Sequence, residues 1–212
     1  MSKLAFIFPG QGAQKAGMGK DFYENSEAAR SFFDNAQKIL DFDLKEMCFG
    51  EHEELNLTEY TQPCMVSVCL AIVQELKKRG INPDITAGLS LGEYAAVAAA
   101  GGMNELDAIK LVRRRGILMQ STVPAGEGAM AAVLGLDAKK IEEILESFEN
   151  VWIANYNCPG QIVITGLTNE VQQASLALKE AGAKRVVELK VSGPFHSLLL
   201  KPAGEALLQE ME

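Results

Sequence analysis

The segment AGLSLGEYAAVAAAGG, residues 87–102, constrains the fold of this chain more than any other segment. It places a serine between two glycines, after a short apolar run and before an alanine-rich stretch that favours a helix. Residues 88–92, GLSLG, fit the G-x-S-x-G nucleophile elbow, in which a strand meets a helix at a turn tight enough to require glycine. The elbow exposes Ser90 Oγ and brings the Leu91 N–H and the helix N-terminus beside it, where they can stabilise an oxyanion. A glycine-flanked turn with a capping serine is the alternative that the motif alone leaves open.

Strand and helix patterns alternate through the first part of the chain. Apolar periodicity and turn signals predict strands over 4–8 and 85–90 and helices over 23–40, 63–79 and 104–119. For the second helix, Thr61 is the expected N-cap and Pro63 falls in the first turn. This alternation indicates a parallel sheet that is covered by helices on both faces.

The pattern of strands and helices changes after a segment that contains Pro124, Gly126 and Gly128. These residues are typical of a flexible boundary, so a second unit is expected to begin there. Asp137 and Thr168 are the expected N-caps of the two helices in that unit. The predicted strands are 129–136, 151–157, 161–167 and 185–191, and the helices are 138–148 and 168–181. The resulting β-α-β-β-α-β order is the ferredoxin-like pattern, with both helices on one face of an antiparallel sheet. The chain becomes helical again from about residue 197.

Composition and charge exclude several classes of protein. The 212 residues carry a formal charge of -8, which disfavours nucleic acid as a partner. No window approaches the roughly 18 apolar residues of a membrane span, and the opening apolar run is too short for a signal peptide. The four cysteines lack paired spacing, so neither a metal site nor disulfides are expected. We therefore expect a cytoplasmic chain with free thiols and no membrane or metal partner.

A serine nucleophile needs a base, and the chain contains only two histidines. His52 lies in a charged loop and is expected on the surface. His196 follows the last predicted strand, at a junction where its side chain could reach over a cleft. A structural role for His196 remains the alternative.

Seven sequence blocks extend over most of the chain: IFPGQGAQ (7–14), TQPC (61–64), GLSLGEYAA (88–96), RRRGILMQ (113–120), GAMAAVLGL (128–136), NYNCPGQIVITG (155–166) and VSGPFHS (191–197). In this order and spacing they resemble the malonyl-CoA:acyl carrier protein transacylase family of bacterial fatty acid synthesis. The resemblance implies an α/β-hydrolase-like large domain with a parallel sheet over 1–124 and 197–212. It also implies an inserted ferredoxin-like subdomain over 125–196.

The resemblance further implies a reaction. A malonyl group would pass from malonyl-CoA to the phosphopantetheine thiol of acyl carrier protein through an acyl-serine intermediate, with no tightly bound cofactor. Ser90 would be the nucleophile and His196 its general base. Backbone amides of Gln11 and Leu91 would form the oxyanion hole. Arg115 would hold the free carboxylate of the malonyl group, which its planar guanidinium can bind through two hydrogen bonds.

Other residues take roles at the edge of this site. Phe195 resembles the bulky residue that accompanies malonyl rather than methylmalonyl selection, although a methyl group changes binding by only about 1–3 kcal/mol. Asn155 and Asn157 are either substrate contacts at the rim of the cleft or turn-forming residues beside Pro159. A solvated helix face is the expectation for the remaining arginines of the run. A basic patch that receives the acidic carrier protein could nevertheless draw on Arg113, Arg114, Lys184, Arg185 and Lys190.

The chain departs from the family pattern at two points. Leu89 stands where many members carry histidine, and we expect little effect. The sequence stops at Glu212 although the family continues, so we expect an incomplete sheet, a His196 without its carbonyl partner, and self-association. A compact, fully active monomer in sedimentation would contradict this expectation.

Two other functions stay open on the sequence. One is a serine thioesterase or esterase, and the other is a catalytically poor chain that only binds carrier protein. The pathway, fatty acid or polyketide, also stays open.

Overall fold

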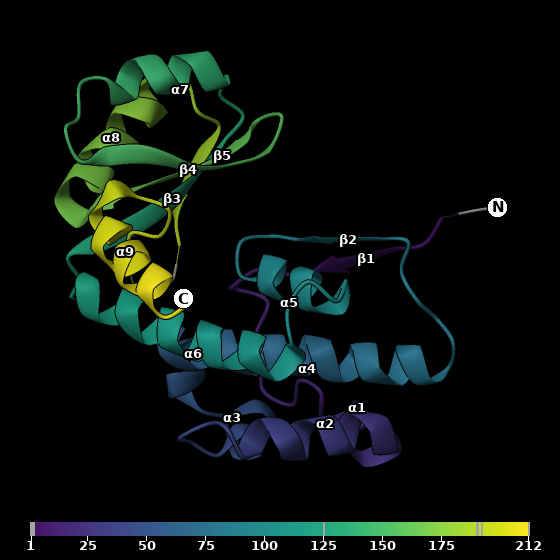
Figure 1. Cartoon of the computed structure of the whole chain (residues 1–212). Coiled ribbons are helices and arrows are strands. Elements are labelled where there is room, and N and C mark those ends of the chain that lie inside the picture. Colours follow the sequence, from purple (N-terminus) through teal and green to yellow (C-terminus); the bar gives the residue numbers. More distant parts are fainter. Residues whose placement is uncertain (1–2, 125, 190, 192, 212) are drawn as a thin grey trace. The chain divides into compact units, whose positions relative to one another are not determined.

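The computed structural model describes residues 3–124, 126–189, 191 and 193–211. These residues form two compact units, one ending at Ile117 and the other spanning Leu118–Glu210. Figure 1 shows the elements of both units. The boundary between the units lies within helix α6 (Glu105–Thr122), whose N-terminal cap is the side chain of Asn104.

The first unit contains a two-stranded parallel sheet, as the alternation of strands and helices predicts. Strands β1 (Ala5–Phe8) and β2 (Ile85–Gly88) pair in register along their whole length. Helix α5 (Gly92–Ala99) packs on this sheet, where Thr86 Oγ1 donates to Ala96 O at 3.0 Å. On the opposite face, Ile7 is 78% exposed and Ile85 is 55% exposed. The described residues therefore cover only one face of the sheet, so the prediction that helices cover both faces is wrong for this part of the chain. Self-association through an unpaired edge of the sheet stays a prediction.

Helices make up the rest of the first unit. They are α1 (Lys20–Asn25), α2 (Glu27–Gln37), α3 (Leu44–Phe49) and α4 (Thr58–Lys78), with a 3-10 turn over Glu53–Asn56. The single helix predicted over 23–40 is wrong, because Ser26 separates α1 from α2. Its backbone is extended, and its hydroxyl accepts a hydrogen bond from Ala29 N at 3.1 Å, as an N-cap does.

Helix α4 begins five residues before the predicted start. Thr61 is therefore not an N-cap but lies inside the helix, where its hydroxyl donates to Leu57 O at 3.0 Å and to Leu55 O at 2.6 Å. A threonine inside a helix can make this bond to the carbonyl four residues earlier, and sequence alone does not distinguish it from a cap. Pro63 consequently falls in the second turn of α4, where its missing N–H leaves the Glu59 carbonyl without a helical donor.

The second unit has the predicted β-α-β-β-α-β order. Its elements are β3 (Gly128–Leu134), α7 (Ala138–Leu145), β4 (Val151–Cys158), β5 (Gln161–Leu167), α8 (Thr168–Glu180) and β6 (Arg185–Glu188). The sheet order is β4-β5-β3-β6, and every neighbouring pair is antiparallel. A 3-10 turn over Leu198–Leu200 and helix α9 (Lys201–Gln209) follow.

Alternating side chains divide the core of the second unit between the two faces of its sheet. Val133 and Ile164 pack with Ile141 of α7 and Val171 of α8, so both helices lie on one face (Figure 1). Met130 and Val163 point to the opposite face, where they pack with Phe195. The strand period of two therefore buries both faces.

The two predicted caps in the second unit have different outcomes. Asp137 caps α7 as predicted, since its carboxylate accepts from Lys139 N at 3.0 Å. Thr168 is instead the first residue of α8 and donates its hydroxyl to Gly126 O at 2.7 Å, so Leu167 occupies the N-cap position. In the part of the chain that the structure describes, no helix is long and apolar enough to cross a membrane.

We predict that Asp137→Ala lowers the free energy of unfolding by about 1 kcal/mol, because the first turn of α7 loses the acceptor for its free amide. Urea denaturation of the wild-type and variant chains measures this difference. Glu143→Ala, an exposed position on the same helix, is the matched control and should change stability by less than about 0.5 kcal/mol. Equal effects of the two substitutions would contradict a capping role.

Candidate active site

The backbone at Ser90 is strained. Ser90 joins the end of β2 to the start of α5 with a φ of 49°, in the left-handed region that most side chains avoid. Among the described non-glycine residues, only Ser90 and His196, with a φ of 60°, have positive φ. Such strain costs about 1–3 kcal/mol and is concentrated at functional sites. The two residues predicted to carry the chemistry are thus the two that the fold holds in this conformation.

Two glycines make the turn around Ser90 possible. A Cβ added to Gly88 would lie 2.1 Å from the carbonyl carbon and oxygen of Gly92. A Cβ added to Gly92 would lie 2.4 Å from Phe8 O and 2.7 Å from Pro9 O. Any larger residue at either position would have to displace backbone, so the strand–turn–helix geometry of the elbow depends on both glycines.

The loop that carries Gln11 runs alongside this turn. Leu89 N donates to Phe8 O at 3.1 Å, and a Cβ added to Gly10 would lie only 2.8 Å from Leu89 O. The side chain of Gln11 is held in place by its Nε2 donating to Thr58 Oγ1 at 2.8 Å. The first unit therefore brings the predicted oxyanion-hole residue Gln11 next to the segment that contains Ser90 and buried Leu91.

Arg115 lies on α6 and reaches both α4 and α5. Its Nη1 donates to Gln62 Oε1 at 2.7 Å, and its guanidinium carbon lies 5.4 Å from the ring centroid of Tyr94. Tyr94 lies in the first turn of α5, four residues after Ser90, so the guanidinium contacts the helix that follows the serine. Gly116 permits this contact between helices, because a Cβ there would lie 2.7 Å from Glu59 Cα.

Arg115 is influenced electrostatically by Glu93 but forms no ion pair with a described residue. Burial lowers the pKa of Arg115, while Tyr94 and Glu93 act in the opposite direction. No ion pair among the described residues includes Arg115. A half-buried guanidinium that donates to a neutral amide, lies against an aromatic ring and forms no ion pair with a described residue is suited to receive an anionic group from a ligand.

Sequence reasoning missed three residues that hold this arrangement together: Thr58, Gln62 and Tyr94. Thr58 and Gln62 are both fully buried, and they lie four residues apart on one side of α4. A signal was available, because Gln62 is a polar residue at the start of a long apolar helix, where burial without a partner would be costly.

His196 lies in a second strained turn, in the second unit. Phe195 is buried in the cluster with Met130 and Val163, and Ser197 Oγ donates to Pro194 O at 2.7 Å. The backbone of Gly128 lies so close to Pro194 that an added Cβ would meet the proline ring at 2.2 Å. These contacts fix the turn on both sides of His196, which is itself exposed.

Asn155 and Asn157 lie in β4, so their interpretation as turn-forming residues beside Pro159 is wrong. Asn155 pairs with Val163 of β5 and is half-buried, whereas Asn157 is exposed. The register of β4 shifts between Tyr156 and Cys158, as it does at a β-bulge. Strand pairing overrides the local turn preference of asparagine at Asn155, and Asn157 lies in β4 at the register shift.

The solvated helix face expected for Arg113 is also wrong. Its side chain is 12% exposed and forms ion pairs with Asp41 and Glu59, which removes Arg113 from the predicted basic patch. Arg114, Lys184 and Arg185 are exposed, and Lys190 lies outside the described residues. His52, expected on the surface, is half-buried with its Nε2 3.0 Å from Glu46 Oε1.

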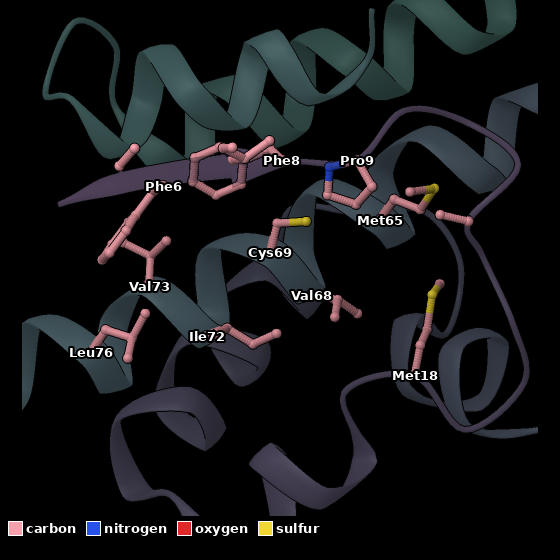
Figure 2. A pocket seen from close by; sticks show the side chains of 13 residues that line it. Phe6, Phe8, Pro9, Met18, Met65, Val68, Cys69, Ile72, Val73 and Leu76 are labelled. Carbon is pink, nitrogen blue, oxygen red and sulfur yellow. The ribbon is translucent and has the colours of Figure 1, made fainter. Parts of the chain in front are cut away.

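A cavity of about 400 Å³ lies beside β1 and α4 (Figure 2). It is lined by Ala5, Phe6, Ile7, Phe8, Pro9, Ala13, Met18, Met65, Val68, Cys69, Ile72, Val73 and Leu76. Burial raises the pKa of the Cys69 thiol to about 11, so this thiol is inert at neutral pH. The residues that line the cavity include no lysine, arginine or histidine, and none of the predicted site residues is among them.

We predict that Ser90→Gly is more stable than Ser90→Ala by about 0.5–1 kcal/mol, although glycine ordinarily costs stability. Both variants lack the hydroxyl, but only glycine adopts a φ of 49° without strain. Thermal and urea unfolding of the two variants measure the difference. A more stable alanine variant would show that the turn relaxes to negative φ.

Comparisons with known proteins identify the family. Residues 5–212 match the acyl transferase domain family. The malonyl CoA-acyl carrier protein transacylase of Bacillus subtilis (strain 168) is 49% identical over 217 residues, an alignment that covers 100% of this chain and 68% of that protein.

Solved structures give the same result. The malonyl CoA-acyl carrier protein transacylase of Clostridium perfringens matches with a TM-score of 0.93 at 43% identity, covering 99% of this chain and 67% of that one. A malonyl-transacylase in complex with a type II PKS acyl-carrier protein matches with a TM-score of 0.95 at 40% identity, covering 99% and 70%. This chain thus spans about two thirds of the length of these relatives. The chain belongs to the acyl transferase family and, within it, to the malonyl CoA-acyl carrier protein transacylases.

Proposed function

We propose that this chain transfers malonyl groups from CoA to acyl carrier protein, with Ser90 as the acylated nucleophile and His196 as the base. The observation that carries the proposal is that these two residues alone, among the described non-glycine residues, have positive φ. Strain of this kind persists only where the surrounding structure enforces it, and both turns are enforced by close contacts of glycine backbones.

The proposed first half-reaction is acylation of the enzyme. Ser90 Oγ attacks the thioester carbonyl of malonyl-CoA as the imidazole of His196 takes the hydroxyl proton. The tetrahedral intermediate then collapses, the C–S bond breaks, and the imidazolium protonates the departing CoA thiolate. The second half-reaction runs the same steps in reverse, with the phosphopantetheine thiol of the carrier protein attacking the malonyl-serine ester.

The amides of Gln11 and Leu91 are proposed to stabilise the oxyanion of both tetrahedral intermediates. Support comes from the contact of the Gly10 backbone with Leu89 O and from the anchoring of the Gln11 side chain by Thr58. Both contacts keep the loop after β1 fixed beside the serine, as a preorganised oxyanion hole requires.

Arg115 is proposed to bind the free carboxylate of the malonyl group. Its guanidinium has no ionic partner within the described residues and is oriented by the Gln62 amide and the Tyr94 ring. A neutral acyl group offers nothing to this charge, which therefore favours a dicarboxylic donor over acetyl-CoA. Phe195, buried in its cluster, is proposed to disfavour a branched donor, and Asn155 and Asn157 to contact substrate.

The finer fold assignments also remain our proposals. An α/β-hydrolase-like large domain over 1–124 and 197–212 is supported by the parallel β1–β2 pair and the elbow, whereas the compact units of the structure group residues 118–124 and 197–210 with the second unit. A ferredoxin-like subdomain over 125–196 is supported by the β4-β5-β3-β6 sheet with α7 and α8 on one face. The cytoplasmic location and the lack of a tightly bound cofactor stay predictions.

The carrier protein is proposed to dock through exposed basic residues, among them Arg114, Lys184 and Arg185. The malonyl-transacylase solved with an acyl-carrier protein supports a partner of this class. A serine thioesterase is the competing function, since water could resolve the same acyl-serine. Arg115, which forms no ion pair with a described residue, favours a dicarboxylic acyl donor.

We predict that Ser90→Ala lowers malonyl transfer by about three to six orders of magnitude, because the nucleophile is lost. Malonyl-CoA is mixed with phosphopantetheinylated carrier protein, and malonyl carrier protein and free malonate are quantified by mass spectrometry. Malonate as the main product of the wild-type chain would indicate the thioesterase, and a Ser90→Ala variant with unchanged transfer would refute the serine mechanism.

We predict that Arg115→Ala lowers kcat/KM for acylation by malonyl-CoA about 100-fold, since losing one partner of a buried charge pair costs about 2–5 kcal/mol. Acylation by acetyl-CoA should be unchanged or faster. Lys110→Ala removes an exposed charge from the same helix and is the matched control. A malonyl-to-acetyl preference that survives Arg115→Ala would exclude Arg115 as the carboxylate-binding residue.

A further inference from the structure

Pro63 removes one hydrogen-bond donor from the backbone of α4. In α4 the carbonyl of Glu59 would normally accept from the N–H of residue 63, and proline has none. Arg113 of α6 supplies the missing donor, because its Nη1 lies 2.7 Å from Glu59 O. The defect in one helix is therefore repaired by a side chain of another.

Nε, Nη1 and Nη2 of Arg113 all donate to acceptors in the first unit. Nε and Nη2 donate to the two carboxylate oxygens of Asp41, each at 2.9 Å, and Nη1 also meets Glu59 Oε2 at 3.1 Å. The guanidinium carbon lies 4.8 Å from the ring centroid of Tyr60 and 5.1 Å from that of Phe42. The hydrogen bond from Arg113 holds the pKa of Asp41 below its usual range, so this carboxylate stays ionised at neutral pH.

These contacts lie next to those of Arg115. Arg113 bonds to Glu59 and Arg115 bonds to Gln62, three residues further along α4. Gly116 lies against Glu59 Cα, where no side chain would fit. At the other end of the same two helices, Glu105 accepts from Gln74 at 2.7 Å and from Lys77 at 3.0 Å. Polar side chains therefore set how α6 lies along α4 at both ends.

We infer that Arg113 is a positioning residue for substrate selection: by capping the Glu59 carbonyl and binding Asp41, it fixes α6 against α4 so that Arg115 meets the acyl carboxylate. The inference rests on the proposed function, since it needs Arg115 to bind that carboxylate. Arg113 itself touches no substrate, because its charge is already neutralised by Asp41 and Glu59.

Lysine cannot replace arginine at this position. A single ammonium has no planar fork to bind both oxygens of Asp41 while also reaching the Glu59 carbonyl, and it stacks less well between two rings. Arg113→Lys therefore preserves charge and approximate length but removes the geometry on which the inference depends.

The test compares acylation of the 212-residue chain by malonyl-CoA and acetyl-CoA in Arg113→Lys, Arg115→Ala and the exposed control Lys110→Ala. We expect Arg113→Lys to lower the malonyl-to-acetyl ratio of kcat/KM about 10- to 100-fold, as a displaced binding group does, and to change acetyl-CoA acylation less than about twofold. A parallel loss with both donors would indicate only a structural role and would overturn the inference. The malonyl-to-acetyl preference of Arg115→Ala tests the proposed role of Arg115 separately from the role of Arg113.

A second comparison addresses the carbonyl directly. Pro63→Ala returns an N–H to α4 that can donate to Glu59 O. Arg113→Lys should therefore lower the malonyl-to-acetyl ratio of kcat/KM by a factor at least about threefold smaller in the Pro63→Ala variant than in the wild-type chain. Equal costs in the two backgrounds would show that Arg113 does not act through this carbonyl.

A third measurement needs no turnover. Hydrogen exchange of residues 58–65 should accelerate in Arg113→Lys and not in Lys110→Ala, because the first turns of α4 lose their external donor. Unchanged exchange there would overturn the inference even in a chain whose activity is too low to measure.

Discussion

The proposed site in the first unit depends on a close approach of two backbone segments at positions where only glycine fits. The segment around Ser90 can approach the end of β1 only because Gly88, Gly92 and Gly10 place no Cβ between the chains. That approach gives Ser90 its positive φ and places the Gln11 loop beside it. It also orients α5 so that Tyr94 reaches the Arg115 guanidinium. A single steric requirement thus links strand, turn and helix to the proposed chemistry.

The first two turns of α4 hold three of the residues discussed above in place. Thr58 holds Gln11, Gln62 holds Arg115, and Glu59 receives Arg113. The two arginines are two positions apart on one helix, yet their surroundings give them opposite properties. Arg113 faces two carboxylates and two rings and is electrically satisfied, whereas Arg115 has a neutral amide and one ring as partners. The neutralised charge of Arg113 can stabilise the packing of the helices, whereas the charge of Arg115 can bind an anionic ligand.

Much of the local structure follows from sequence because it depends on local physics. The strands, the strand–turn–helix at Ser90, the order of elements in the second unit and the Asp137 cap all reflect periodicity or turn chemistry within a few residues. The errors have a common cause. Ser26, Thr61 and Thr168 can each cap a helix or bond elsewhere, and the partners available in the folded chain decide which occurs.

The sequence by itself determined where the proposed nucleophile lies, because a tight turn needs glycine in its own immediate segment. It also restricted the proposed base to one of two histidines. It also indicated the family, because the order and spacing of the seven blocks can be read without knowledge of the tertiary contacts. Only the tertiary structure decided which arginine is neutralised, since the acceptors of Arg113 in Asp41 and Glu59 lie 72 and 54 positions away along the chain. Periodicity places a side chain on a face of a helix, but its electrostatic role depends on the residues that folding brings to that face.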